Sequence, residues 1–281
     1  MTPVLPVPTL DHVVVNARDR IDAAADTYRR LGFTLTPRGY HTLGSMNHLA
    51  MFGTDYLELI AAKPGDDSRP EIMGAPIGLD GLVFGTEDAT ATYEALLHNE
   101  VPIDPPQQFS RPVDIAGGMR DAMFRTTRLP RDAAPGGRLY FCQHLTRDVV
   151  WRDEWRHHAN GAVGVTRAVI AAEDPHVLGD LFARMFGARS VRPTDDGCSL
   201  ALGLSRFDVV TPMALWEMFG GAAPDSRGRR DYMAALTIRT LSLDAVETAL
   251  EAGGIRDWDR IGTSILVPAP EAFGVTIEFS V

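Results

Sequence analysis

The sequence predicts an α+β fold in which four βαβββ modules pair into two open β-barrels with helices outside. Two observations predict it. A short apolar strand followed by an amphipathic helix recurs four times along the 281 residues, with strand starts about 70, 85 and 70 residues apart. Two or three further strand-like runs follow each helix. Because one such module leaves a curved sheet face uncovered, two modules must combine to bury it.

The modules contain the same elements in the same order. Opening strands are expected at residues 9–15, 79–84, 165–170 and 234–238. Helices are expected at residues 20–31, 87–99, 175–186 and 243–252, and three of them end at a glycine suited to a C-cap. Modules one and two predict an N-terminal barrel, residues 1–150, and modules three and four a C-terminal barrel, residues 160–281.

The remaining strands are shorter and alternate with turns. They are expected at residues 33–36, 47–52, 56–60, 122–127, 138–143, 199–204, 207–211, 264–267 and 275–279. A segment rich in Pro and Gln, residues 102–112, is interpreted as a loop. Residues 215–230, which contain a Gly pair and a Pro, are interpreted as a second long loop.

Composition limits the partners. The formal net charge of −10 disfavours nucleic acid, because phosphate binding needs a basic surface. No apolar run reaches the roughly 20 residues that a membrane span needs. Cys142 and Cys198 lie inside apolar strand patterns and are expected to be free thiols. Together with residues 1–6, which do not resemble a signal peptide, they predict a cytoplasmic protein.

Short motifs accompany the repeat. They are Leu10-Asp11-His12-Val13, Gly44-Ser45-Met46-Asn47, Tyr56-Leu57-Glu58-Leu59-Ile60, Tyr140-Phe141-Cys142-Gln143-His144 and Trp151-Arg152 with Glu154-Trp155. With the repeat, they resemble the vicinal oxygen chelate superfamily (the glyoxalase, bleomycin resistance and dioxygenase fold), and most closely its glyoxalase-like domain family. The resemblance covers nearly the whole chain. It is specific for the fold and weak for the reaction, because one scaffold carries many chemistries.

The resemblance implies a metal site in the first barrel. Members of the superfamily take metal ligands from the first and last strands of paired modules, where alternate side chains face one cavity. At these positions the chain has His12 and Glu58 in the first module, and Gly81 and Gln143 in the second. The implied ligands are therefore His12, Glu58 and Gln143, holding a divalent ion such as Zn, Ni, Mn or Fe.

The second barrel offers fewer ligands. The corresponding positions are assigned to Arg167, Val209, Ala235 and Glu278, of which only the last is a good ligand. The resemblance places the two-histidine, one-carboxylate site of extradiol dioxygenases in this half. Ring-cleaving dioxygenase chemistry is therefore rejected for this chain.

A metal-free pocket is the open alternative. His12 and Glu58 would then form an acid/base pair, in which a partly desolvated Glu58 with a raised pKa removes a proton next to a carbonyl. The two residues could equally be a structural ion pair.

Three further residues are candidates for substrate binding. His41 lies on a Gly-flanked loop that can reach a barrel mouth, or be exposed to solvent. Asn47 lies on a strand and can bind a substrate oxygen or fix a turn. Arg125 interrupts an apolar strand, where it can hold a carboxylate or phosphate, or face solvent.

Two hypotheses of function follow. In the first, the resemblance implies a glyoxalase-like lyase or isomerase that acts, with metal assistance, on a small oxygenated compound, with Glu58 and His12 as catalytic residues. In the second, the chain is a metal-free protein that sequesters a small molecule, as resistance proteins of this fold do. A homodimer is compatible with both. The sequence lacks the motifs of serine hydrolases, P-loop nucleotide triphosphatases and zincins.

Overall fold

The computed structural model describes residues 5, 8–65 and 68–281. The expectation about residues 1–6 therefore lies, apart from Leu5, outside the described residues. The first two modules contain β1 (Leu10–Asn16), α1 (Ile21–Arg30), β2 (Gly39–Tyr40), β3 (Ser45–Met51), β4 (Tyr56–Ala62), α2 (Pro70–Met73), β5 (Gly78–Gly85), α3 (Ala89–His98), β6 (Gln107–Ile115), β7 (Gly118–Arg128) and β8 (Arg138–His144).

A connector with α4 (Arg147–Val150) and a 3₁₀ turn at Asp153–Trp155 leads to the other two modules. They contain β9 (Ala162–Ala171), α5 (Pro175–Phe186), β10 (Val191–Thr194), β11 (Gly197–Leu202), β12 (Ser205–Val210), α6 (Pro212–Phe219), β13 (Tyr232–Thr240), α7 (Leu243–Ala252), β14 (Asp259–Ile261), β15 (Ser264–Val267) and β16 (Thr276–Ser280).

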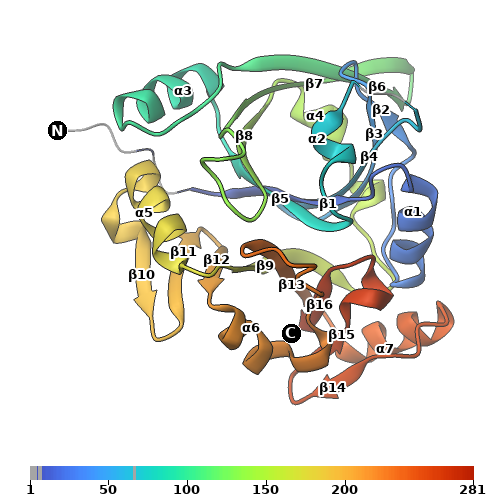
Figure 1. Ribbon diagram of the computed structural model, residues 1–281. Helices are drawn as coiled ribbons and strands as arrows, with labels where there is room; N and C mark the ends of the chain where they lie inside the picture. The colour runs from blue at the N-terminus through green and yellow to red at the C-terminus, as the bar shows by residue number, and fades with distance from the viewer. Residues whose placement is uncertain (1–4, 6–7, 66–67) are drawn as a thin grey trace.

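The strands form two eight-stranded sheets of identical topology (Figure 1). The first sheet has the order β2-β3-β4-β1-β5-β8-β7-β6, and the second has the order β10-β11-β12-β9-β13-β16-β15-β14. In each module the opening strand runs parallel to the closing strand, and paired modules meet through antiparallel opening strands, β1 with β5 and β9 with β13. The predicted fold class, four βαβββ modules in two curved sheets with helices outside, is confirmed.

Three local predictions were wrong. Residues 33–36 form no strand, because only Thr36 is hydrogen-bonded to β3. Its N donates to Leu49 O, its Oγ1 accepts from Leu49 N, and its O lies 2.8 Å from His48 Nδ1. The segment at 102–112 is partly strand β6, an edge strand, where Pro112 is tolerated. The loop expected at 215–230 begins inside α6, whose start is capped by Thr211 with a Pro at the first helical position.

One apolar core joins the two sheets. It contains residues from the faces of β1, β5, β9 and β13 that point away from the barrel interiors, together with α1, α5 and α7. Phe84, Phe186 and Phe207 meet in it, with ring centroids 5.0 and 5.6 Å from Phe84. The two halves are therefore joined by a continuous apolar core.

The two barrel interiors differ in what fills them. In the second barrel, Ala214, Leu215 and Phe219 of α6 pack against the inner face of the sheet. In the first barrel, edge strand β6 approaches the β2–β3 turn, and Thr42 N donates to Ser110 O at 2.9 Å. That contact nearly closes the first sheet around a polar cavity.

Both cysteines are free and buried, as predicted. Among the described residues, no helix has the length and apolar character that crossing a bilayer requires.

Asp55 joins the two halves and should make stability depend on pH. Its Oδ1 accepts from Val165 N at 2.9 Å, and burial raises the pKa of Asp55 to about 7. Because the folded-state pKa is the higher one, the contribution of Asp55 to stability is fully present below pH 4 and is lost as pH rises to about 7. We expect Asp55→Asn, which keeps the acceptor oxygen, to raise the free energy of unfolding at pH 8 by about 1–3 kcal/mol.

Thermal unfolding of both proteins at pH 4 and pH 8 checks this expectation. The difference in Tm should be near zero at pH 4 and positive at pH 8. A variant that is less stable than the wild type at pH 8 would show that the carboxylate itself stabilises the contact between the halves.

Candidate functional site

A cavity of about 40 Å³ opens inside the first barrel. His12 of β1 and Glu58 of β4 both line it, because the parallel register pairs Val14 with Glu58 and strand alternation gives His12 the same face as Val14. His12 Nε2 lies 3.7 Å from Glu58 Oε2, and both side chains are buried. The structure thus brings these two predicted residues together.

Asp11 orients the His12 ring. Asp11 Oδ1 accepts from His12 Nδ1 at 2.5 Å, which leaves the Nε2 lone pair facing the cavity. Burial opposes ionisation of Asp11, but the charge of His144 and hydrogen bonds from His12 and His144 outweigh it and lower the pKa of Asp11. The Tyr56 ring stacks on the His12 ring with centroids 4.4 Å apart. The imidazole is therefore held in one orientation, with Nε2 directed into the cavity.

Tyr140 of β8 completes the group. Its hydroxyl lies 3.1 Å from His12 Nε2, and burial raises the pKa of Tyr140 well above its usual value. The phenol therefore stays protonated and can donate to His12 or to a bound oxygen.

Glu58 is ionised at neutral pH. Burial raises its pKa. The charges that His12 and His41 carry in their protonated forms at low pH, together with a hydrogen bond from Asn47, outweigh burial, so that the net shift of the pKa is downward. The expectation of a raised pKa was wrong, because the carboxylate is surrounded by donors and cations instead of apolar groups.

His41 and Asn47 also line the cavity. Asn47 Nδ2 donates to Glu58 Oε1 at 2.6 Å and lies 3.3 Å from His41 Nε2. His41 Nδ1 lies 2.9 Å from Ser45 Oγ, and burial lowers the pKa of His41 to about 4. The Asn47 amide therefore holds one oxygen of Glu58, the neutral His41 ring contacts that amide, and the other oxygen of Glu58 lies toward His12.

Gln143 lies elsewhere, contrary to its assignment as a ligand. Its Oε1 accepts from Ala89 N at 3.2 Å and its Nε2 donates to Glu87 O at 2.6 Å, outside the cavity. The register shows why. Glu58 pairs with Val14, which lies two positions after His12. The residue two positions after Gly81 is Val83, and it pairs with Tyr140. Tyr140, not Gln143, is the counterpart of Glu58.

The same register corrects the second sheet. Val169 lies two positions after Arg167 and pairs with Asp208. The assignment of Val209 was therefore wrong by one residue. Asp208 accepts from Arg167 Nε at 2.5 Å and from Ser199 Oγ at 2.7 Å. The counterpart in the last module is Glu278, as assigned, and it accepts from Thr237 Oγ1 at 2.7 Å. Both carboxylates of this face are already engaged.

Arg125 does not line the cavity. Its neighbours on β7, Phe124 and Thr126, line the cavity, so that Arg125 lies on the opposite face of the strand. There its guanidinium donates to Gln108 Oε1 at 3.2 Å. The cavity contains four other arginines that the sequence reasoning missed: Arg69, Arg111, Arg128 and Arg138. Counting strand alternation from Phe124 would have predicted Arg128 on the inner face.

The donor set is one ligand short for the metal ion that the fold family implies. Catalytic zinc sites use three protein ligands, whereas this position has His12 and Glu58, a protonated phenol at Tyr140 and no side chain at Gly81. A Cβ at Gly81 would lie 2.9 Å from Val14 Cβ, so close packing of β1 on β5 excludes the missing third ligand there. The surrounding arginines also oppose a divalent cation.

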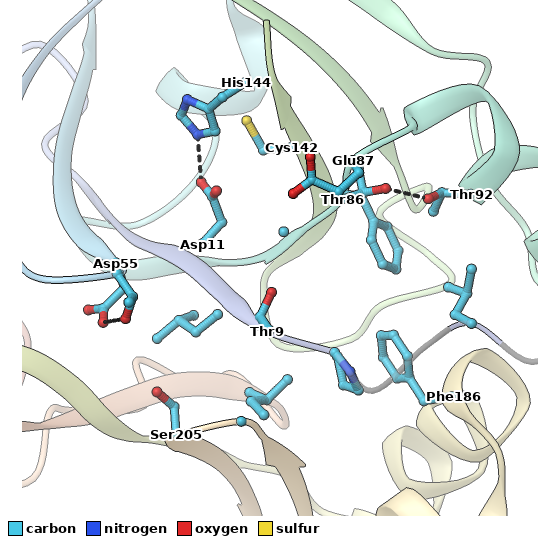
Figure 2. Close-up of a pocket in the computed structure, with 18 of the residues that line it drawn as sticks. Thr9, Asp11, Asp55, Thr86, Glu87, Thr92, Cys142, His144, Phe186 and Ser205 are labelled. Carbon is cyan, nitrogen blue, oxygen red and sulfur yellow. Dashed lines mark hydrogen bonds and ion pairs between the residues drawn. The ribbon is translucent and has the colours of Figure 1, made fainter. Parts of the chain in front are cut away.

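A second group of side chains that could bind a metal ion includes Asp11. The ligand atoms of Asp11, Cys142 and His144 all lie within 4.8 Å of one another. Figure 2 shows them at one end of a larger cavity, of about 820 Å³, between the first barrel and the second half. Asp11 Oδ1 also accepts from His144 Nε2 at 3.1 Å, so that this group braces the side chain that orients His12.

Comparisons with known proteins agree with this fold. A crystal structure of a hypothetical protein from Staphylococcus aureus is 12% identical, with a TM-score of 0.66 over 98% of this chain and 99% of that one. A mutant of 4-hydroxymandelate synthase from Streptomyces coelicolor is 12% identical, with a TM-score of 0.58 over 98% and 92%. A fusion of a xylose isomerase-like TIM barrel with a 4-hydroxyphenylpyruvate dioxygenase is 13% identical, with a TM-score of 0.59 over 99% and 49%.

At this identity the likeness shows the fold alone. No curated protein sequence matches the chain. The sequence pattern of the family described as glyoxalase-like domain matches residues 10–186, which is more than half of the chain and includes the whole first barrel. The chain therefore belongs to the glyoxalase-like domain family.

Proposed function

We propose that the protein is a lyase or isomerase that moves a proton at a carbon next to a carbonyl in a small oxygenated compound. The observation that carries the proposal is the His12–Glu58 pair, with an ionised carboxylate 3.7 Å from an imidazole nitrogen that Asp11 has oriented. Both groups line a cavity in the first barrel.

The two groups suit two different protons. Glu58 Oε2 takes the proton from carbon, and the charge that moves to the carbonyl oxygen is stabilised by the Tyr140 hydroxyl and nearby arginines. His12 Nε2 accepts or returns the proton of a substrate hydroxyl, because its lone pair faces the cavity. Return of the first proton to the neighbouring carbon gives an isomer, and loss of a leaving group gives a lyase product.

The cavity limits the substrate to a small compound. Its volume of about 40 Å³ is enough for roughly three water molecules or a fragment of several heavy atoms. The larger cavity between the sheets is lined by Asp11, Asp55, Glu87 and Asp88 and has no comparable group of cations.

The test is exchange of carbon-bound hydrogen in D₂O, followed by proton NMR over a panel of 2-oxo and 2-hydroxy acids and their uncharged esters. We expect the wild-type protein to accelerate exchange in at least one compound, and to keep doing so after dialysis against EDTA, because the donor set is one ligand short. No exchange with any compound would count against proton transfer. Activity that EDTA removes and Zn²⁺ or Mn²⁺ restores would contradict the metal-free form of the proposal and show that the reaction depends on a bound ion.

A further inference from the structure

The first barrel contains two buried arginines without a counter-ion. Arg111 of β6 is 5% exposed, and no ion pair or hydrogen bond of its guanidinium occurs among the described residues. Arg128 of β7 likewise lacks a carboxylate there, and its guanidinium lies over the Tyr140 ring, 5.4 Å from the centroid. Burial lowers the pKa of both arginines, which reflects the cost of holding these charges away from water.

The other two arginines of the cavity are paired, which makes the contrast informative. Arg69 forms an ion pair with Glu71 at 2.5 Å, and Arg138 forms one with Asp80 at 2.9 Å. Arg69 and Arg138 thus have carboxylate partners within the protein, as structural arginines usually do. Glu58 is the one carboxylate among the described residues that line the cavity, and Glu71, which also acts on Arg128, is already engaged by Arg69.

Unpartnered polar atoms gather at the same place. Five buried side-chain atoms that lack a hydrogen-bond partner among the described residues belong to residues that line this cavity: Asn47 Oδ1, Arg111 Nε, Thr126 Oγ1, Arg128 Nε and Arg138 Nη2. Buried polar groups without partners are rare because each costs about 1–3 kcal/mol. Three of the five are cationic donors, which is the complement of a bound anion.

The absence of a side chain at Gly39 leaves space for the side chains of Arg111 and Asn47. A Cβ at Gly39 would lie 2.5 Å from Asn47 Oδ1 and 2.8 Å from Arg111 Cδ. Any larger residue on β2 would push the Arg111 side chain out of its path across the closed edge of the barrel.

We propose that Arg111 and Arg128 form a clamp for the carboxylate of a small organic acid, which places the neighbouring carbon of that acid beside Glu58 and His12. Planar guanidinium forks match the two oxygens of a carboxylate. The cavity volume of about 40 Å³ suits a carboxylate with a few carbon atoms. The clamp names the substrate class of the proposed proton transfer, so that it deepens that function and rests on the same cavity.

Malonate is the probe for the clamp, with inorganic phosphate as the comparison at equal ionic strength. We expect malonate to bind the wild-type protein in titration calorimetry and to raise its Tm. Arg111→Met and Arg128→Met should each weaken malonate binding by about 10-fold or more, without lowering the Tm of the free protein. Arg125→Met, on the same strand as Arg128 but on its outer face, is the matched control and should bind as the wild type does.

The outcomes separate the clamp from the proposed function. Malonate that does not bind the wild type, or that binds both arginine variants unchanged, overturns the clamp. Preference for phosphate over malonate overturns the carboxylate as the ligand. Malonate binding together with no hydrogen exchange in the acid panel supports the clamp and contradicts the proton transfer. Exchange only in the uncharged esters contradicts the clamp and supports the proton transfer.

Discussion

Replacement of Glu58 by glutamine should lower the rate of hydrogen exchange by about 10²–10⁴-fold, the range that a general base contributes. The amide has nearly the shape of the carboxylate and can still accept from Asn47, so that the fold should be kept. KM for an organic acid should fall or stay constant, because the change removes the negative charge that opposes the anion. The measurement is kcat and KM by NMR exchange.

The matched control is Glu278→Gln, the carboxylate at the corresponding position of the second sheet, which should leave exchange unchanged. The pH profile adds a second check. Because the pKa of Glu58 lies below its usual 4.5, the loss of kcat/KM that protonation of Glu58 causes should appear only below that pH. An acid limb near pH 6–7 would show that Glu58 is not the base that limits the reaction.

Replacement of Asp11 by asparagine should be nearly as severe, with an expected loss of about 10²–10³-fold in kcat. The amide group can donate to His12 Nδ1, which would move the ring proton to Nε2 and remove the lone pair from the cavity. Asp11 acts through His12, so that it is a positioning residue. KM should change little, because Asp11 does not line the cavity.

Nitrogen-15 NMR of the His12 ring separates this role from a structural one. In the wild type the protonated nitrogen should be Nδ1, and in Asp11→Asn it should be Nε2. His144→Gln is the comparison, since it removes the other partner of Asp11 and should keep the Nδ1–H of His12. Loss of activity with an unchanged His12 tautomer would contradict the account of Asp11.

The repeat made most of the fold predictable. Strand-helix periodicity located α5 and α7 to the residue, and it placed the opening strands within a few residues of β1, β5, β9 and β13. The motifs that resemble the glyoxalase-like domain family placed His12 and Glu58 on the first and last strands of one module, and the structure has the two side chains together. These features depend on local patterns, and a single sequence contains those patterns.

Features that depend on pairing between strands were not predictable in the same way. The counterparts of Glu58 follow from registers such as Val83 with Tyr140 and Val169 with Asp208, and motif alignment missed them by three residues and by one. A slip of an odd number of residues transfers a side chain to the other face of the sheet. Gln143 and Val209 were assigned through such slips.

The arginines were hidden for a different reason. Arg111 lies beside Pro112 in a segment whose composition indicates a loop, and β6 is a strand only because β7 pairs with it. The net charge of −10 also gives no indication that a local cluster of cations exists. Burial concentrates positive charge in one cavity while the acidic residues remain mostly outside it.

The most direct test of the central claim is a crystal structure of the protein with malonate, or with the acid that exchanges best. The account predicts density for the anion inside the first barrel, with its carboxylate between Arg111 and Arg128 and its central carbon facing Glu58 and His12. Density only in the larger cavity between the sheets, beside Asp55 and Glu87, would contradict it.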